Sequence, residues 1–284
     1  MIKLIASDMD GTLLNSNHKI SEENIKAIKE AERKGIRFAI ATGRDYESVK
    51  PVLNEYNLKC ECIVMSGAEY RDINGSVLES IEIDNEDIKK IIEELHLVGL
   101  SCDILTDKGV YGSNKELYEK GLKERKEMLE NTMSEEKLKE FEKQFRYLFN
   151  PKYVSDINTF TNENIKIYKV MAYSKDCELI EELKGKFNKN ENIAVASTFS
   201  NDIEITHVNA QKGRIISKVI KKLNIEKDEV MVLGDSFNDY SMFTEFNNSF
   251  AMGNAIDEIK NIATYITDSN DNNGVAKAIY KMIK

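Results

Sequence analysis

The fold of this chain is decided by residues 3–14, Lys3-Leu4-Ile5-Ala6-Ser7-Asp8-Met9-Asp10-Gly11-Thr12-Leu13-Leu14. A short apolar run ends there in two aspartates separated by one residue, and a glycine and a threonine follow. In an open α/β sheet, catalytic groups lie at the carboxyl ends of the strands. Side chains alternate along a strand, so Asp8 and Asp10 would share a face if the strand continued through both. The turn that Gly11 permits lets the two carboxylates converge on one cation instead.

Two carboxylates this close repel each other unless a positive charge lies between them. A hard divalent cation such as Mg²⁺ is the usual partner, because it binds one or two carboxylates and keeps several waters. Phosphate oxygens can then take the remaining positions. In the alternative interpretation, Asp8 and Asp10 are solvated loop residues that cap the next helix.

Composition excludes several classes of protein. Of the 284 residues, 41% are hydrophobic and two are proline, as in an ordinary globular protein of one large or two modest domains. The 40 basic and 49 acidic residues give a formal net charge of −9, which opposes binding to nucleic acid or to an anionic membrane. We expect the amino terminus to enter a strand directly, without the basic region and long apolar stretch of a signal peptide, and no apolar run approaches the ~20 residues of a spanning helix. We therefore expect a cytoplasmic protein, and its oligomeric state stays open.

Cysteine and histidine do not form a metal-site pattern. Cys60, Cys62, Cys102 and Cys177 make no paired CxxC motifs, and the three histidines are scattered. A structural zinc site is therefore not expected. We expect free, buried thiols in a reducing compartment.

Strands and helices alternate in the first part of the chain. Apolar runs at residues 36–41 and 62–65 follow helices predicted over residues 21–34 and up to about residue 56. This order predicts a parallel, doubly wound sheet with right-handed crossovers. The Asn74-Gly75 pair between two extended segments then predicts a β-hairpin.

Beyond the hairpin the alternation is lost, which indicates an inserted domain. The segment up to residue 188 is rich in charge, with a long helical region over residues 115–145, and it lacks the βαβ rhythm. Extended runs at residues 192–197 and 202–206 are expected to resume the sheet. We therefore predict an α/β fold in which residues 1–82 and 191–284 form the doubly wound core and residues 83–190 an inserted α+β domain.

Four edges of the predicted sheet carry polar side chains. They are Asp8 with Asp10, then Thr42 with Gly43 and Arg44, then Lys212 at a helix start, and finally Asp235 with Asn238 and Asp239. The carboxyl ends of a doubly wound sheet face one crevice, so these groups can meet there. Together they suit phosphoryl transfer, which needs positioning, a cation and an in-line nucleophile. Taken alone, each could be only a turn or a surface residue.

Four of the six charged residues of this set receive roles in the chemistry. Asp8 is expected to be the nucleophile that forms an aspartyl-phosphate. Asp10 is expected to be the general acid for the leaving alkoxide and then the base for the hydrolytic water. Asp235 would complete a magnesium site with Asp8 and the backbone carbonyl of Asp10. Lys212 would neutralise phosphate oxygens and hold the nucleophile.

Neutral contacts complete the expected phosphate site. Thr42 and Asn238 would donate hydrogen bonds to the phosphoryl group. Asp239, with Ser236 beside it, would lie behind the metal site and orient metal-bound water or Lys212. The other residues expected to contact phosphate or substrate are Met9, Gly43 and Arg44.

These motifs resemble those of the haloacid dehalogenase superfamily of phosphohydrolases. In chain order they are DMDGTLL at residues 8–14, TGR at 42–44, Lys212-Gly213, and GDSFND at 234–239. The insertion between the second and third motifs resembles the Cof-type subfamily with a C2 cap, and the resemblance spans essentially the whole chain. It implies a Rossmann-like core, Mg²⁺, an aspartyl-phosphate on Asp8, and a cap that closes over small phosphorylated metabolites. Ser66 and Ser236 depart from the family pattern, which often has asparagine at the first position and an acidic or asparagine residue at the second.

Three functions follow from these motifs. The leading one is a Mg²⁺-dependent phosphomonoesterase that acts on a small phosphorylated metabolite, such as a sugar phosphate. A phosphomutase or phosphotransferase would instead pass the phosphoryl group to a sugar hydroxyl. A non-enzymatic metabolite sensor would only be phosphorylated on Asp8, and the leaving-group acid expected at Asp10 argues against it.

Overall fold

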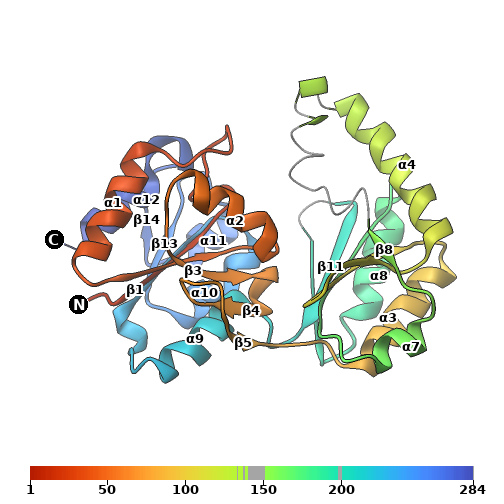
Figure 1. The fold of residues 1–284 in the computed structure, drawn as a ribbon. Helices are drawn as coiled ribbons and strands as arrows, with labels where there is room; N and C mark the ends of the chain where they lie inside the picture. The colour runs from red at the N-terminus through yellow and green to blue at the C-terminus, as the bar shows by residue number, and fades with distance from the viewer. Residues whose placement is uncertain (133, 137, 140–150, 198–199, 284) are drawn as a thin grey trace. The chain divides into compact units, whose positions relative to one another are not determined.

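The protein is seen in a computed structural model that describes residues 1–132, 134–136, 138–139, 151–197 and 200–283 (Figure 1). The chain divides into two compact units. We call the first, Met1–Ile81 with Asn209–Lys284, the core domain, and the second, Glu82–Val208, the inserted domain. None of the described helices combines the length and apolar character that a membrane span requires.

The core domain is built on a sheet of eight strands. Their spatial order is β14 (Tyr265–Ile266), β13 (Asn248–Ala251), β12 (Val230–Gly234), β1 (Leu4–Asp8), β2 (Arg37–Ala41), β3 (Glu61–Val64), β4 (Glu69–Arg71) and β5 (Val77–Ser80). All neighbours from β14 to β3 are parallel. The chain runs outward from β1 in both directions, so the strand order reverses beside β1, where open α/β sheets bind ligands. The predicted doubly wound parallel sheet is confirmed.

Helices connect these strands. They are α1 (Glu22–Arg33), α2 (Tyr46–Glu55), α9 (Lys212–Lys222), α10 (Tyr240–Glu245), α11 (Asp257–Ile262) and α12 (Gly274–Met282). The Oγ of Ser21 accepts a hydrogen bond from the backbone N–H of Asn24 and so caps α1, as its position before the apolar pattern predicts. Ile28 and Ala31 lie on the buried face of α1, and α12 packs beside this helix (Figure 1).

The predicted hairpin closes one edge of the core sheet. β4 and β5 pair in antiparallel fashion. In the turn between them, Asp72 Oδ1 accepts hydrogen bonds from the backbone N–H groups of Asn74 and Ser76, at 2.9 and 2.8 Å. The Asn-Gly signal therefore marks the turn correctly.

The inserted domain has a six-stranded sheet of its own. Its spatial order is β10 (Ile193–Ala196), β11 (Asp202–His207), β9 (Ile167–Tyr173), β6 (Cys102–Thr106), β7 (Gly109–Gly112) and β8 (Lys152–Tyr153). One face packs against α3 (Asn85–Leu97), α7 (Ile157–Asn162) and α8 (Cys177–Phe187) in a single apolar core. The long charged helix is described as α4 (Lys115–Thr132), and residues 140–145 of the prediction lie outside the described residues.

The chain returns to the core domain at residue 209, not at residue 191. β10 pairs with β11, and β11 pairs with β9, both in antiparallel fashion. The prediction that residues 192–197 and 202–206 resume the core sheet is therefore wrong. Short apolar runs fit either sheet, and their local sequence does not identify the strand beside which they pair.

All four cysteines are free. Cys60, Cys62 and Cys102 are buried, as expected, whereas Cys177 is exposed at the start of α8. The expectation of buried thiols therefore holds for three of them.

Asn24 provides a test of the packing between α1 and α12. Its buried Oδ1 accepts a hydrogen bond of 3.0 Å from the backbone N–H of Ala276, in the first turn of α12. We expect Asn24→Ala to lower the free energy of unfolding by about 1–3 kcal/mol, because this buried N–H loses its partner. Urea unfolding measures the change.

The matched control is Asn54→Ala, since Asn54 is exposed on α2. We expect this variant to change the free energy of unfolding by less than about 0.5 kcal/mol. Equal losses in the two variants would show that the Asn24 hydrogen bond does not stabilise the fold.

Candidate active site

Lys212 lies at the centre of the site. It is the first residue of α9, and its side chain is completely buried. Its Nζ donates hydrogen bonds to Asp8 Oδ1 at 2.7 Å and to Asp239 Oδ1 at 2.6 Å. Burial alone would lower the pKa of Lys212, but the carboxylates of Asp239 and Asp8 outweigh this effect and raise it. A permanent positive charge is therefore held inside the core domain.

Asp8 ends the central strand β1 and is almost fully buried. Lys212 contacts Oδ1, whereas Oδ2 has no hydrogen-bond partner among the described residues. Burial and the carboxylates of Asp239 and Asp235 raise the pKa of Asp8, and Lys212 opposes this shift. One oxygen of a buried carboxylate thus remains available to a ligand.

Asp239 supports the site from the turn that follows β12. Its Oδ2 accepts hydrogen bonds from the backbone N–H groups of Asp235 and Ser236, at 2.9 and 3.2 Å. Its Oδ1 accepts the bond from Lys212. Both oxygens already have protein partners, so Asp239 is better suited to orient Lys212 and the turn than to bind a ligand.

Asp235 follows the end of β12 and approaches the turn after β1. Its Oδ1 accepts a hydrogen bond of 3.1 Å from Thr12 Oγ1. A Cβ on Gly11, whose φ is +79°, would lie 2.4 Å from Asp235 Oδ2, so only glycine allows this approach. Burial and Asp239 raise the pKa of Asp235 to about 6, although Lys212 opposes the shift.

These side chains fit a divalent cation. One oxygen from each of Asp8, Asp235 and Asp239 lies within 4.8 Å of the others. Three carboxylates face the single ammonium of Lys212, and burial together with the neighbouring carboxylate of Asp239 raises the pKa of Asp8 and of Asp235. Oxygen donors with excess negative charge suit a hard cation, and the available Oδ2 of Asp8 is a ready ligand.

Asp10 lies apart from the carboxylate cluster and pairs with Arg44. The Asp10 carboxylate is 46% exposed and accepts hydrogen bonds from Arg44 Nε at 2.9 Å and from Nη2 at 2.5 Å. That Arg44 contacts phosphate stays a prediction, and the structure shows its side chain in this bidentate ion pair. The pair fixes the side chain to which the sequence assigns acid and base catalysis.

The other predicted residues lie around this centre. Thr42 follows β2 and is buried, and its Oγ1 accepts a hydrogen bond from the Arg44 backbone N–H. Asn238 Oδ1 accepts from Lys212 Nζ at 3.3 Å and from Ser236 Oγ at 3.0 Å. Met9 is buried between Asp8 and Asp10, and Gly43 joins Thr42 to Arg44.

The loop of residues 65–67 has a strained backbone and packs against the start of α9. Met65, Ser66 and Gly67 have φ values of 50°, 59° and 102°, a left-handed conformation that is costly for the first two residues. A Cβ on Gly67 would lie 2.4 Å from the backbone carbon of Gln211, next to Lys212. Ser66 therefore occupies a loop that positions the lysine, at the point where the sequence departs from the family pattern.

Sequence reasoning missed two residues that hold the turn after β1. Thr12 was part of the first motif but received no role, and it binds Asp235. Asn254 Nδ2 donates a hydrogen bond of 2.8 Å to the carbonyl of Gly11. Asn254 lies three residues after β13, and no sequence motif marks it.

Comparison with known proteins identifies relatives along the whole chain. The sequence profile of the haloacid dehalogenase-like hydrolases matches residues 5–279. Phosphatase YwpJ of Bacillus subtilis (strain 168) is 30% identical over 282 residues, which cover 97% of this chain and 98% of that protein. The 5-amino-6-(5-phospho-D-ribitylamino)uracil phosphatase YcsE of the same organism is 33% identical over 278 residues, covering 98% and 94%.

Solved structures give the same result. A haloacid dehalogenase-like hydrolase from B. subtilis superposes with a TM-score of 0.82 at 28% sequence identity, covering 99% of this chain and all of that one. The resemblance drawn from the four motifs is therefore confirmed by a profile match, by curated relatives and by fold. The chain belongs to the haloacid dehalogenase-like hydrolase family.

Proposed function

We propose that the protein is a Mg²⁺-dependent phosphomonoesterase that hydrolyses a small phosphorylated metabolite through an aspartyl-phosphate on Asp8. The observation that carries this proposal is the available Oδ2 of Asp8 beside the buried ammonium of Lys212. A carboxylate oxygen is free to attack while its partner oxygen is held in place. The names of the relatives, which include several phosphatases, agree with this chemistry.

In the first step, Asp8 Oδ2 attacks phosphorus and the bond to the leaving oxygen breaks. Asp10 gives its proton to that oxygen, so the product leaves as an alcohol. This step requires that Asp10 carries a proton when the substrate is bound. Lys212 stabilises the negative charge on the transferring phosphoryl group.

In the second step, water attacks the phosphorus of the aspartyl-phosphate. Asp10, now a carboxylate, takes a proton from this water as the bond from phosphorus to Asp8 breaks. Orthophosphate leaves and Asp8 is again a carboxylate. Lys212, which Asp239 keeps in place, holds Asp8 for the next cycle.

The residues that would hold Mg²⁺ are Asp8, Asp235 and the backbone carbonyl of Asp10. When bound, the ion would neutralise charge on the phosphate oxygens. Thr12 and Gly11 keep Asp235 in position for this role.

The substrate class follows from chemistry and from the relatives. A net charge of −9 disfavours nucleic acid and anionic membranes as partners, whereas a local cation and Lys212 can bind one phosphate group. YcsE is named for a phosphorylated ribitylamino-uracil, so this compound belongs with sugar phosphates in the substrate panel. We place the protein in the cytoplasm, where its free cysteines stay reduced.

The nucleophile is tested by Asp8→Asn. We expect turnover of p-nitrophenyl phosphate with Mg²⁺ to fall at least about a thousandfold, because an amide oxygen is a poor nucleophile. Phosphate release without an added acceptor also separates a hydrolase from a phosphotransferase. The control is Asp257→Asn on the exposed start of α11, which should keep full activity. Substantial turnover by a folded Asp8→Asn variant would disprove the assignment.

The metal site is tested by the pH dependence of Mg²⁺ binding. The folded-state pKa of Asp235, about 6, lies above the usual value of 3.8. Protonated Asp235 therefore stabilises the metal-free protein at low pH, and this contribution is lost as pH rises through about 6. We expect Mg²⁺ to raise the melting temperature more at about pH 8 than at about pH 5, where Asp235 must release a proton first.

Thermal unfolding with Mg²⁺ or excess EDTA at both pH values measures this effect. Asp235→Asn should remove most of the Mg²⁺ response, and Asp257→Asn should retain it. EDTA should stop turnover, and added Mg²⁺ should restore it. An equal Mg²⁺ response at both pH values in the unmodified protein would show that Asp235 does not bind the ion.

A further inference from the structure

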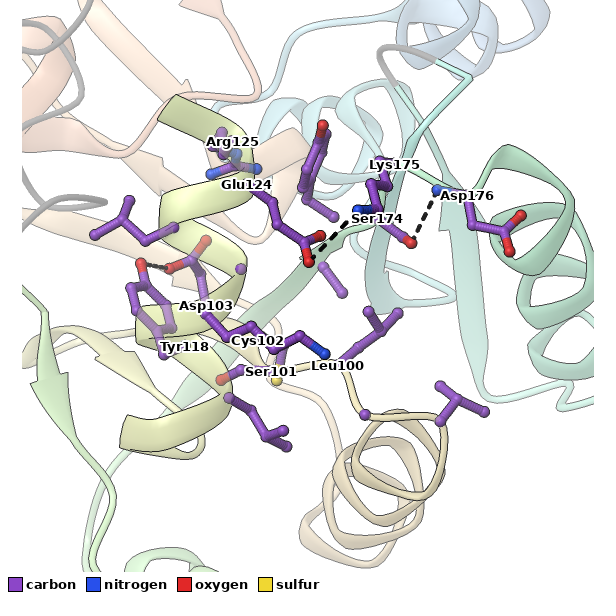
Figure 2. A pocket seen from close by; sticks show the side chains of 18 of the residues that line it. Leu100, Ser101, Cys102, Asp103, Tyr118, Glu124, Arg125, Ser174, Lys175 and Asp176 are labelled. Carbon is purple, nitrogen blue, oxygen red and sulfur yellow. Dashed lines mark hydrogen bonds and ion pairs between the residues drawn. The ribbon is translucent and has the colours of Figure 1, made fainter. Parts of the chain in front are cut away.

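A cavity of about 220 Å³ lies within the inserted domain, under α4 (Figure 2). Its wall comes from α4, from the start of β6, from the loop before β6 and from the end of β9 with the loop that follows. All of these residues belong to the inserted domain. Its size, and a lining that combines apolar side chains with a few charged groups, suit a small metabolite.

Asp103 supplies a buried charge to the cavity wall. It is only 5% exposed, and its side chain points away from the apolar core that Cys102 and Ile104 enter. Its Oδ1 accepts a hydrogen bond of 2.5 Å from Tyr118 on α4 (Figure 2). No other side-chain hydrogen bond joins this carboxylate to the described residues, so Oδ2 is left for a ligand. Burial raises the pKa of Asp103, although Arg125 opposes the shift, so an additional cation would be favourable here.

Arg125 supplies a guanidinium to the same cavity. It lies two helical turns beyond Tyr118 on α4, so the two side chains share one face of the helix. Its guanidinium carbon lies 4.9 Å from the centre of the Tyr173 ring. Within the described part of the chain, no hydrogen bond or ion pair engages this guanidinium. Its planar set of N–H donors is therefore available to a carboxylate.

Gly121 keeps the space between these two groups open. It lies on α4 between Tyr118 and Arg125 and lines the cavity. A Cβ built there would have no atom within 4 Å, so neither packing nor backbone conformation requires glycine. Glycine is nonetheless the poorest helix former after proline. Gly121 therefore leaves this part of the cavity unfilled, between Tyr118 and Arg125 on α4.

We propose that this cavity binds a free α-amino acid, with the ligand ammonium on Asp103 and the ligand carboxylate on Arg125. Asp103 on β6 and Arg125 on α4 bring charges of opposite sign to the same cavity, which matches a small zwitterion. The lining contains three acidic and three basic residues, Asp103, Glu124, Asp176, Lys120, Lys175 and Arg125, and Glu124 pairs with Lys175. A polyol would leave the Arg125 guanidinium without an anion, and a phosphate ester would bring two negative charges to a wall that has no excess of basic residues.

The cavity lies at the strand ends remote from the connections to the core domain. The chain enters the inserted domain at Glu82, and the next residue, Ile83, donates its N–H to Ile167 at the start of β9. The cavity instead contains Tyr173, at the end of β9. The proposal therefore concerns a second ligand site and does not rest on the proposed phosphatase activity.

Binding is tested with the full chain by adding each proteinogenic α-amino acid separately. We expect at least one to raise the melting temperature by about 2–4 °C at saturation, and titration calorimetry to give its Kd. The N-acetyl derivative and the methyl ester of that amino acid should both fail to bind. Asp103→Asn should raise the Kd at least about tenfold, because the ammonium loses its counter-charge.

Gly121→Leu should abolish binding by filling the cavity. Its control is Gly185→Leu on α8, where a Cβ also has no atom within 4 Å but the site is outside the cavity lining. Circular dichroism verifies that both variants fold. The proposal is overturned if no amino acid binds, if Gly121→Leu binds as well as Gly185→Leu, or if orthophosphate displaces the amino acid.

Discussion

The architecture of the core domain depends on one buried charge, the ammonium of Lys212. Removing such a group from water costs several kcal/mol, which only well-placed negative partners can offset. Those partners are Asp8, at the end of β1, and Asp239, after β12. Strands β1 and β12 must therefore lie side by side, and α9 must begin at the carboxyl edge of the sheet. The requirement to balance one charge therefore positions the same three elements that build the proposed active site.

Sequence predicted these relations because their physical causes are local and repetitive. Buried runs that end in Asp8 and Gly234-Asp235 indicate parallel strands, and parallel strands bring their carboxyl ends to one edge. The predicted domain boundary at residue 191 was wrong because the cause of strand pairing in this segment is not local. β10 and β11 are short apolar runs, and their place beside β9 depends on which sheet edge is open in the folded protein. That information is distributed over the inserted domain and is absent from the runs themselves.

Contacts between loops also could not be predicted from the sequence. Arg44 pairs with Asp10 because two turns from neighbouring strands come within hydrogen-bond distance, and the TGR motif does not carry that geometry. Asn254 reaches the carbonyl of Gly11 across more than two hundred residues of sequence. Gly121 in a charged helical pattern indicates only a weak helix, and the open space beside it emerges when α4 is placed over β6. Such features depend on side-chain positions, which periodicity does not determine.

The layout of the two domains along the chain has a consequence for synthesis on the ribosome. The inserted domain is one continuous segment, Glu82–Val208, so all of its strands have been translated before α9 begins. The first half of the core domain, in contrast, is translated before β12, so β1 lacks its neighbour on that side until β12 has been synthesised. During that interval the nascent chain exposes an unpaired, apolar strand edge, the kind of surface that chaperones protect. Translation of β12 (Val230–Gly234) is what ends this exposure.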